Sequence, residues 1–398
     1  MRIAHLADLH LGFRQYHRQN ANGINQREAD VANAFRSAVD GVIAAAPDCI
    51  IVAGDLFHSV RPTNAAIVFA FRQFQRLREA LPRTPIILVA GNHDTPRSSE
   101  TGSILKLFEE IGVDVAADGP RRLVYPEGNL SVLAVPHQSL MESPRPALRP
   151  EGDELFQVLI LHGEVEGIFP ADRSTTEYGG ALLGPSDYSA EGWTYVALGH
   201  YHVQTAVTPR VWYSGSLDYV SSNPWGELAE EGARRKAGQG SAVGKGWLLA
   251  DLRTGQVQPQ AISLARRVYD LPAVDAEGKS GEEVNRLIAE RVGGISGGIA
   301  DQIVRLVVRN IPRHVGRELD HVKLREYKAA ALHFQLDLRR PESSREIGTG
   351  TPGRRATLSE VVREYLGGRP LPTGIDRDAF VTVGGDLVDA AERDFAAS

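Results

Sequence analysis

Residues 85–94 read PIILVAGNHD, a short apolar run that ends in a glycine followed by polar residues. A similar arrangement occurs at residues 49–55, CIIVAGD, and at residues 1–8, MRIAHLAD. Each run is rich in aliphatic and β-branched residues and is bounded by turn residues, so each is predicted to be a buried strand. The run LSVLAV (130–135) extends this prediction to a fourth strand, and the runs FQVLILHG (156–163), TYVALGHYH (194–202), RVWYSGS (210–216) and GWLLADL (246–252) are expected to form a second sheet packed on the first.

Helical patterns separate the first three predicted strands, at residues 28–45 and 64–79. In the first pattern Val31, Phe35 and Val42 fall on one helical face. Alternation of strand and helix implies parallel pairing, whereas the later strands carry less helix between them. We therefore expect an α/β fold, a four-layer α/β/β/α sandwich. The segment 223–245, rich in Gly, Glu and Arg, is expected to be a mobile surface loop.

The length of 398 residues predicts more than one domain. Residues 1–265 form the first expected domain, and residues 266–340 have the pattern of a small βαβαβ module. Residues 341–356, rich in Pro, Gly and Ser, are expected to be a linker. Residues 357–398 form a helical tail, with one apolar-faced helix at 358–366 and a short polar helix around 386–395. This tail is expected to dock on a partner, or alternatively to fold back on its own chain.

Composition limits the class of protein. The net charge of −6 argues against a freestanding nucleic-acid binder, although Lys and Arg outnumber Asp and Glu in residues 266–340, the part a polyanion would prefer. The N-terminus does not resemble a signal peptide, and no apolar stretch approaches the ~20 residues that span a bilayer. The lone Cys49 cannot form an internal disulfide. We expect a cytoplasmic protein without membrane association.

Potential metal ligands gather where the predicted strands end, which is where open α/β sheets place their ligands. The predicted ligands are Asp8, His10, Asp55, Asn92, His162, His200 and His202. Carboxylate, imidazole and amide oxygen together suit Mn²⁺, Fe²⁺ or Zn²⁺, and two ions ~3.5–4 Å apart need a bridging carboxylate. The spacing predicts a two-metal hydrolase of phosphate esters. His93 would protonate the leaving oxygen, with Asp94 orienting its other nitrogen.

Each of these motifs alone has a structural explanation, since DxH and GD also occur in ordinary turns; their joint occurrence in this order carries the prediction. The order DxH, GDxxH, GNHD, HG and GHxH resembles the calcineurin-like metallophosphoesterase superfamily. Within it the chain is similar to the SbcD family of DNA-repair nucleases over residues 1–220. The matching stretches are ADLHLG, GDLFHSVRPTNAA, GNHDTPR, LHGEV, LGHYHVQTA and YSGSLDYVS.

This resemblance implies a role for each matching residue. One metal would be held by Asp8, His10, Asp55 and His202, and the other by Asp55, Asn92, His162 and His200, with Asp55 bridging. His93 would be the transition-state histidine, and His58 would position the strand backbone for exonuclease action.

The resemblance also implies a function: a DNA exonuclease and endonuclease with two Mn²⁺ per chain, Fe²⁺ and Zn²⁺ remaining open. It would act on DNA ends or hairpins in double-strand break repair, as a homodimer with an SbcC-type, SMC-like ATPase bound to the tail. Residues 266–340 would be the capping, DNA-binding domain.

Two alternatives stay open. A small-molecule or cyclic-nucleotide phosphodiesterase would not need the long segment after His202. A DNA-end tethering subunit with incidental catalysis would not need the complete ligand set.

Overall fold

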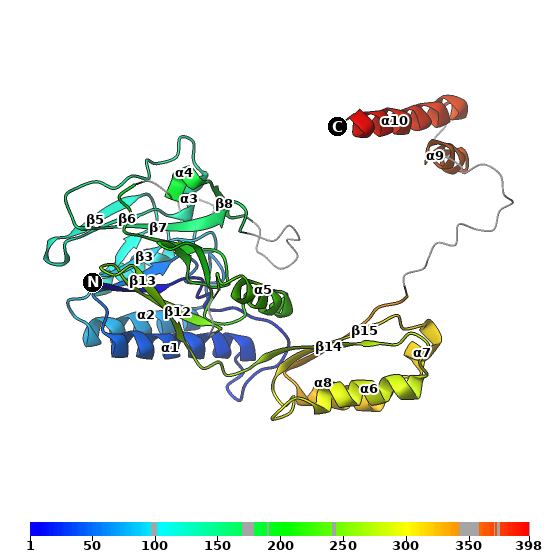
Figure 1. The fold of residues 1–398 in the computed structure, drawn as a ribbon, viewed down its shortest axis with the longest axis horizontal. Helices are drawn as coiled ribbons and strands as arrows, with labels where there is room; N and C mark the ends of the chain where they lie inside the picture. Colours follow the sequence, from blue (N-terminus) through cyan, green and yellow to red (C-terminus); the bar gives the residue numbers. More distant parts are fainter. Residues whose placement is uncertain are drawn as a thin grey trace. The chain divides into compact units, whose positions relative to one another are not determined.

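The computed structural model describes residues 1–96, 102–168, 179–188, 191–240, 244–341, 358–369, 371 and 375–397. The chain divides into two compact units, Met1–Arg339 and Arg340–Ser398. In the first unit two large β-sheets lie face to face, and a small three-stranded sheet with its own helices follows them (Figure 1).

The first sheet has six strands in the order β13-β12-β1-β2-β3-β4. Its strands are β1 (Arg2–Leu6), β2 (Cys49–Ala53), β3 (Ile86–Val89), β4 (Asp114–Ala116), β12 (Gly246–Asp251) and β13 (Gln256–Ala261). Strands β1 to β4 are parallel, while β12 and β13 pair antiparallel. The expectation that GWLLADL lies in the second sheet is wrong, because this run forms β12 and pairs with β1. Because β1, β2 and β3 run in one direction, their carboxyl ends meet at one edge of the sheet.

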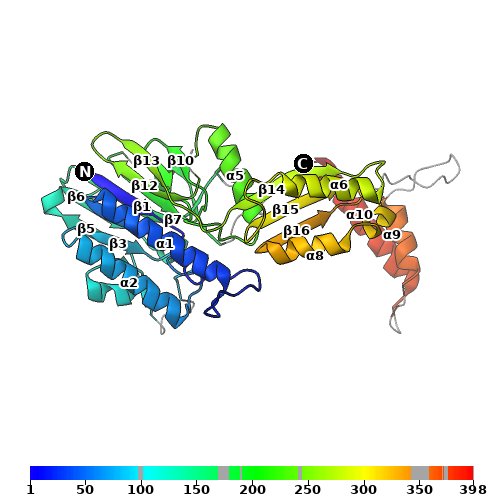
Figure 2. The ribbon, with the colours of Figure 1, turned by 90° about the horizontal axis from the view of Figure 1, so that it is seen from below.

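Two long helices cover the outer face of this sheet and connect its parallel strands, as Figure 2 shows from below. They are α1 (Gln26–Ala45) and α2 (Asn64–Ala80), and the 3₁₀ helix η2 (Ile104–Ile111) precedes β4. The side chains of Asn25 and Thr63 accept hydrogen bonds from backbone N–H groups in the first turns of α1 and α2, which stabilises the point where each helix begins. Both predicted helices are confirmed, and Phe35 and Phe74 lie in the core beneath them.

The second sheet has seven strands, in the order β10-β11-β9-β7-β6-β5 with β8 paired to β7. Its strands are β5 (Arg121–Tyr125), β6 (Leu130–Ala134), β7 (Phe156–Val165), β8 (Ala181–Leu183), β9 (Tyr195–Gly199), β10 (Thr205–Thr208) and β11 (Val211–Tyr213). In the described part of the chain its outer face carries the short helices α3 (His137–Met141) and α4 (Pro185–Tyr188), and η3 (Pro126–Gly128) lies between β5 and β6. Between the two sheets Ile51, Val89 and Val158 form a fully buried core.

The expectation of a mobile loop at residues 223–245 is wrong. Pro224–Lys236 forms helix α5, begun by the Asn223 side chain, which accepts a hydrogen bond from the backbone N–H of Gly226. The helix buries Trp225, Glu227 and Glu231, and Lys245 beyond it is also buried. The composition of the segment is polar because its buried face holds an ion-pair cluster as well as apolar side chains.

The small module follows β13. Its parallel sheet consists of β14 (Val268–Asp275), β15 (Ile303–Arg309) and β16 (His333–Leu338), with β15 in the centre. Its helices are α6 (Gly281–Gly293), α7 (Arg313–Arg317) and α8 (His321–Ala330), and α6 and α8 lie side by side on one face of the sheet (Figures 1 and 2). At the start of the module, Nε of Arg266 lies 2.8 Å from Oδ2 of Asp30 in α1.

The second unit contains α9 (Leu358–Gly367) and α10 (Arg377–Ala397), which pack on each other. The predicted helix at 358–366 is confirmed, but the polar helix expected around 386–395 begins much earlier, at Arg377. Gly384 and Gly385, which disfavour a helix in isolation, lie against Leu366 and Arg363 of α9. Apart from Pro341, the predicted linker 341–356 lies outside the described residues.

The core under α2 provides a test of this packing. Phe74→Ala is expected to lower the free energy of unfolding by about 3–5 kcal/mol, because a buried ring is replaced by a cavity. Arg72→Ala on the exposed side of the same helix should change it by less than about 0.5 kcal/mol. Urea unfolding followed by circular dichroism measures both, and equal effects of the two substitutions would contradict the packing described.

Candidate metal centre

The ends of five parallel strands bring the predicted ligands together. Asp8 and His10 follow β1, Asp55 follows β2 and Asn92 follows β3 in the first sheet. In the second sheet, His162 lies in β7, and His200 and His202 follow β9. All of these side chains are buried except that of Asn92, which is partly exposed. The interior of the protein thus contains a dense group of carboxylates and imidazoles, which needs charge compensation.

Asp8, His10 and His202 form the first ligand cluster, with donor atoms within 4.8 Å of one another. Nε2 of His10 and Nε2 of His202 are 3.1 Å apart, so both rings point the same nitrogen at one place. Oδ1 of Asp8 accepts a hydrogen bond from the backbone N–H of His200. The other oxygen, Oδ2, is buried and makes no hydrogen bond within the described part of the chain. A buried carboxylate oxygen beside two converging imidazoles fits a bound cation.

Asp55, His162 and His200 form the second ligand cluster, again with donor atoms within 4.8 Å. Oδ1 of Asn92 lies 2.9 Å from Nε2 of His162 and 3.1 Å from Nδ1 of His200. Nδ1 of His162 lies 2.9 Å from the carbonyl oxygen of Ala53. A carbonyl can only accept, so Nδ1 carries hydrogen and Nε2 is the nitrogen for a metal.

Asp55 lies between the two clusters. Its Oδ2 is 3.2 Å from Nε2 of His162 and 3.8 Å from Nε2 of His10, and its Oδ1 accepts a hydrogen bond from the backbone N–H of His93. Burial acts to raise the pKa of Asp55, but His162, His10 and His93 outweigh it and hold that pKa well below its ordinary value. The carboxylate of Asp55 therefore lies between the two clusters, where one anionic group could be shared by two cations.

The same charges act on His162. Burial alone would lower its pKa, but the carboxylate of Asp55 outweighs burial and raises the pKa to about 9. Without an ion, a proton on this histidine compensates the buried carboxylates. A divalent cation can replace that proton, since the ligand set is anionic and the histidine must be neutral to bind.

The backbone supports this arrangement at a cost. Asp8, His10, Asp55 and His200 all have φ between 44° and 96°, the left-handed region that non-glycine residues rarely adopt. Strain of this kind costs ~1–3 kcal/mol per residue and is concentrated at functional sites. Gly91 lets this backbone pack closely, because a Cβ on it would collide with the Asp55 carboxylate.

His58 and His93 lie beside the first cluster. Nδ1 of His58 is 3.2 Å from Nδ1 of His10, and the rings of His58 and His93 are stacked with centroids 5.2 Å apart. Nδ1 of His93 lies 2.8 Å from the carbonyl oxygen of His58 and so carries hydrogen. Both rings are partly exposed, unlike the buried imidazoles behind them. They are therefore the imidazoles of the site that a substrate can reach.

The expected contact of Asp94 with His93 is replaced by another. The Asp94 carboxylate accepts hydrogen bonds from the backbone N–H groups of Leu56, Phe57 and Gly91. It therefore holds together the two loops that carry Asp55 and Asn92, while the carbonyl of His58 orients His93. A buried carboxylate near several backbone donors binds them in preference to a ring at the surface.

Two buried glutamates at the site were not predicted from the sequence. Oε1 of Glu164 lies 3.4 Å from Nε2 of His200, and Oε1 of Glu227 lies 3.6 Å from Nδ1 of His202. Each glutamate faces the nitrogen of its histidine that points away from the cluster. Carboxylates in this position fix the orientation of ligating histidines. Glu164 follows His162 in the motif LHGEV, which was the one signal available.

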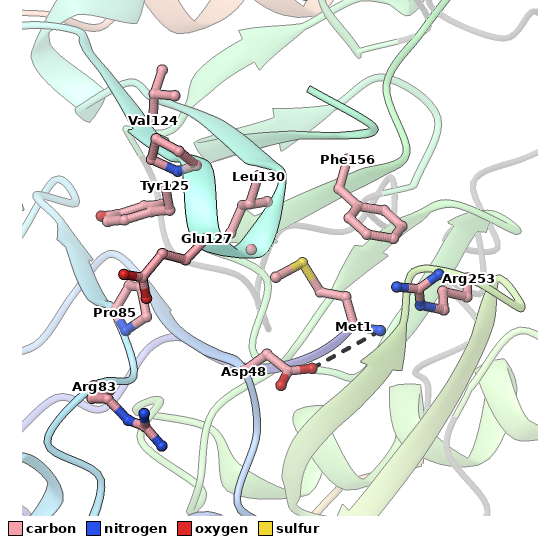
Figure 3. Close-up of a pocket in the computed structure, with 12 residues that line it drawn as sticks. Met1, Asp48, Arg83, Pro85, Val124, Tyr125, Glu127, Leu130, Phe156 and Arg253 are labelled. Atoms are coloured by element: carbon pink, nitrogen blue, oxygen red, sulfur yellow. Dashed lines mark ion pairs between the residues drawn. The ribbon is translucent and has the colours of Figure 1, made fainter. Parts of the chain in front are cut away.

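A cavity of about 540 Å³ at the opposite pole of the sandwich has no part in this site. Figure 3 shows Met1, Asp48, Pro85 and Phe156 around it, next to the amino ends of β1, β2, β3 and β7. The ligand clusters lie at the carboxyl ends of these strands. None of the predicted site residues lines this cavity.

The fold and this donor set define a metallophosphoesterase: two buried Asp/His clusters that meet at a carboxylate, on paired sheets of an α/β protein. The family model described as calcineurin-like phosphoesterase matches residues 1–204. The chain belongs to this family.

Relatives are found among archaeal proteins named DNA double-strand break repair protein Mre11. The one from Saccharolobus solfataricus is 29% identical over 229 residues, covering 56% of this chain and 54% of that protein. The one from Sulfurisphaera tokodaii is 31% identical over 210 residues, covering 51% and 49%. The one from Methanococcus maripaludis is 27% identical over 302 residues, covering 73% and 75%. The chain spans about half the length of the first two relatives and is distantly homologous to all three.

Among the helices of the described residues, none combines the length and the apolar character needed to cross a membrane.

The bridging position of Asp55 can be tested by counting bound ions. If the two clusters hold two ions, Asp55→Asn is expected to weaken the binding of both, because the shared negative charge is lost, and the number of Mn²⁺ bound per chain should fall from two to less than one. Asp48→Asn, at the opposite pole, should leave the count unchanged. Equilibrium dialysis with elemental analysis measures it. Binding of two ions by Asp55→Asn with unchanged affinity would show that Asp55 does not bridge.

Proposed function

We propose that this protein is a Mn²⁺-dependent nuclease that hydrolyses phosphodiester bonds at DNA ends or hairpins in double-strand break repair. The observation that carries the proposal is the meeting of two ligand clusters at Asp55, with His93 beside them. The relatives named as double-strand break repair proteins support DNA as the substrate. Fe²⁺ and Zn²⁺ suit the same donors, and Mn²⁺ is chosen by resemblance to the SbcD family.

The proposed reaction needs two bound ions, each held by its own set of residues. In this proposal Asp8, His10, Asp55 and His202 hold one ion, and Asp55, Asn92, His162 and His200 hold the other. Two bound ions would supply Lewis acidity toward the phosphate oxygens and an activated water for in-line attack.

Two further histidines act on the substrate itself. His93, oriented by the carbonyl of His58, donates a proton through Nε2 to the oxygen that leaves phosphorus. His58 positions the DNA backbone beside His93, on which its partly exposed ring stacks.

The small module is the proposed DNA-binding cap, with residues 1–265 as the nuclease domain and residues 266–340 as the cap. A cavity of about 570 Å³ at their junction is lined by Tyr16, His17, Arg18, Lys328 and His333. Cations and aromatic rings of this kind bind the backbone and bases of nucleic acids. An acidic nuclease domain can thus bind DNA with help from the more basic module.

The remaining assignments concern partners. Residues 357–398 are proposed to bind an SbcC-type, SMC-like ATPase through apolar side chains of α9 and α10, of which Val361, Tyr365 and Leu387 are exposed. A homodimer is proposed through α1 and α2. An apolar groove of about 280 Å³ between these helices, lined by Ile24, Phe69 and several alanines, supports this contact.

The nuclease activity can be measured on end-labelled linear duplex, single-stranded and hairpin DNA with Mn²⁺, with and without the ATPase partner. The wild type should cleave DNA, and His93→Ala should reduce the rate by about 10²–10⁴-fold because proton donation is lost. His93→Ala should still bind both ions, since in this proposal His93 holds neither of them. His314→Ala, on an exposed face of α7, should cleave like the wild type.

Two results would overturn this function. One is the absence of DNA cleavage under all of these conditions. The other is turnover of a small phosphodiester that far exceeds turnover of DNA, which would favour a small-molecule esterase.

A further inference from the structure

Helix α5 (Pro224–Lys236) lies between the main sheets and the small module, next to β14 in both views (Figures 1 and 2). Trp225 and Glu227 occupy its first turns, and both are almost fully buried, at 4% and 2% exposure. Residues two apart on a helix point about 200° away from each other. The two side chains therefore point from opposite sides of the helix. Their contacts show which part of the protein each side faces.

Trp225 binds the small module. Its indole Nε1 donates a hydrogen bond to the backbone carbonyl of Tyr269 in β14, at 3.1 Å. The guanidinium of Arg305 in β15 lies 5.1 Å from the centre of the indole ring, and Asp270 holds that guanidinium in place. The ring also packs in a buried apolar cluster with Ile303 and other residues of the module. Movement of the module relative to the main sheets must therefore move Trp225 or break these contacts.

Glu227 faces the metal centre. Its Oε1 is 3.6 Å from Nδ1 of His202 and accepts a hydrogen bond from the backbone N–H of Ser221 at 2.8 Å. Its Oε2 lies 2.7 Å from Nζ of Lys245. That ammonium also donates to the backbone carbonyl of His202 at 2.8 Å. Both the ring and the backbone of one metal ligand are thus attached to a single cluster of buried charges.

Within this cluster one ammonium offsets part of the charge of two carboxylates. Lys245 is paired with Glu231 of α5 as well as with Glu227, and its Nζ lies 4.7 Å from the ring centre of Tyr219. Buried ion pairs hold their geometry strictly, because a displaced partner leaves an uncompensated charge in a low-dielectric interior. The cluster is therefore a stiff connection between α5 and His202.

We propose that α5 couples the position of the small module to the metal ligand His202. Glu227 is the positioning residue, and Trp225 is the contact through which α5 follows the module. The ion held by Asp8, His10 and His202 then depends on the module, whereas the ion held by Asn92, His162 and His200 does not. Glu164 provides the comparison, because it faces His200 in the same way but lies on β7 of the main sheet. The inference rests on the proposed two-metal site.

The experiment is a Mn²⁺ titration of the full-length chain, followed by calorimetry and by electron paramagnetic resonance. The wild type should bind two ions and give the spectrum of a magnetically coupled pair. Glu227→Gln should weaken one ion by about 10–100-fold and leave the other unchanged, so that an isolated-ion spectrum appears at intermediate Mn²⁺. Trp225→Ala should weaken an ion in the same way, although it removes no group within the metal centre.

Three control variants make the result specific. Trp225→Phe keeps a ring in the apolar cluster but loses the bond to Tyr269, so its effect should be smaller than that of Trp225→Ala. The double variant Trp225→Ala with Glu227→Gln should bind the ion held by Asp8, His10 and His202 little more weakly than Glu227→Gln alone. Both substitutions act on the affinity for that ion through the same contacts. Combining Trp225→Ala with Glu164→Gln should weaken both ions independently.

Each outcome decides between the possibilities. Retention of the second ion shows that a variant is folded, so a loss of both ions in parallel would overturn the proposal in favour of a general structural role. Unchanged Mn²⁺ binding by Trp225→Ala would overturn the coupling, and unchanged binding by Glu227→Gln would overturn the positioning role. A wild type that binds no Mn²⁺ would instead refute the proposed function, and the coupling with it.

Discussion

The rest of this structure depends on the interaction of the buried Asp55 carboxylate with the imidazoles of His10 and His162, which lie on either side of it. A charge in this position is stable only if cations or protons surround it. The fold brings imidazoles, which can carry protons or bind cations, to this carboxylate. It does so because parallel strands of two facing sheets end near one place. It also accepts left-handed backbone at Asp8, His10, Asp55 and His200 to aim the donors inward. Divalent ions bound by these donors would offset the buried negative charge.

The convergence of the seven candidate ligands could be predicted from the sequence, because six of them follow short apolar strands within four residues and His162 lies in β7. The period and length of those strands predict a parallel sheet, and the carboxyl ends of parallel strands must meet. Asp94 shows where this reasoning stops. Its distance from His93 along the chain suggested a contact, whereas nearby backbone N–H groups offered better donors. Local sequence does not reveal which of several donors a buried carboxylate will bind.

Helix α5 could not be predicted for a different reason. Its segment is rich in charge and glycine, which favours an exposed loop when composition alone is considered. In the structure Glu227, Glu231 and Lys245 are buried as mutual partners, and that pairing joins residues distant in sequence. The same limitation applies to α10, where Gly384 and Gly385 disfavour a helix locally but allow α9 to approach. In both cases tertiary contact outweighs local propensity.

The central claim is that Asp55 bridges two ions at the meeting point of the sheets. Anomalous X-ray diffraction from crystals grown with Mn²⁺ tests it most directly. The account predicts two anomalous peaks ~3.5–4 Å apart, one beside Asp8, His10 and His202, the other beside Asn92, His162 and His200, with Asp55 between them. A single peak, or two peaks that Asp55 does not join, would contradict it.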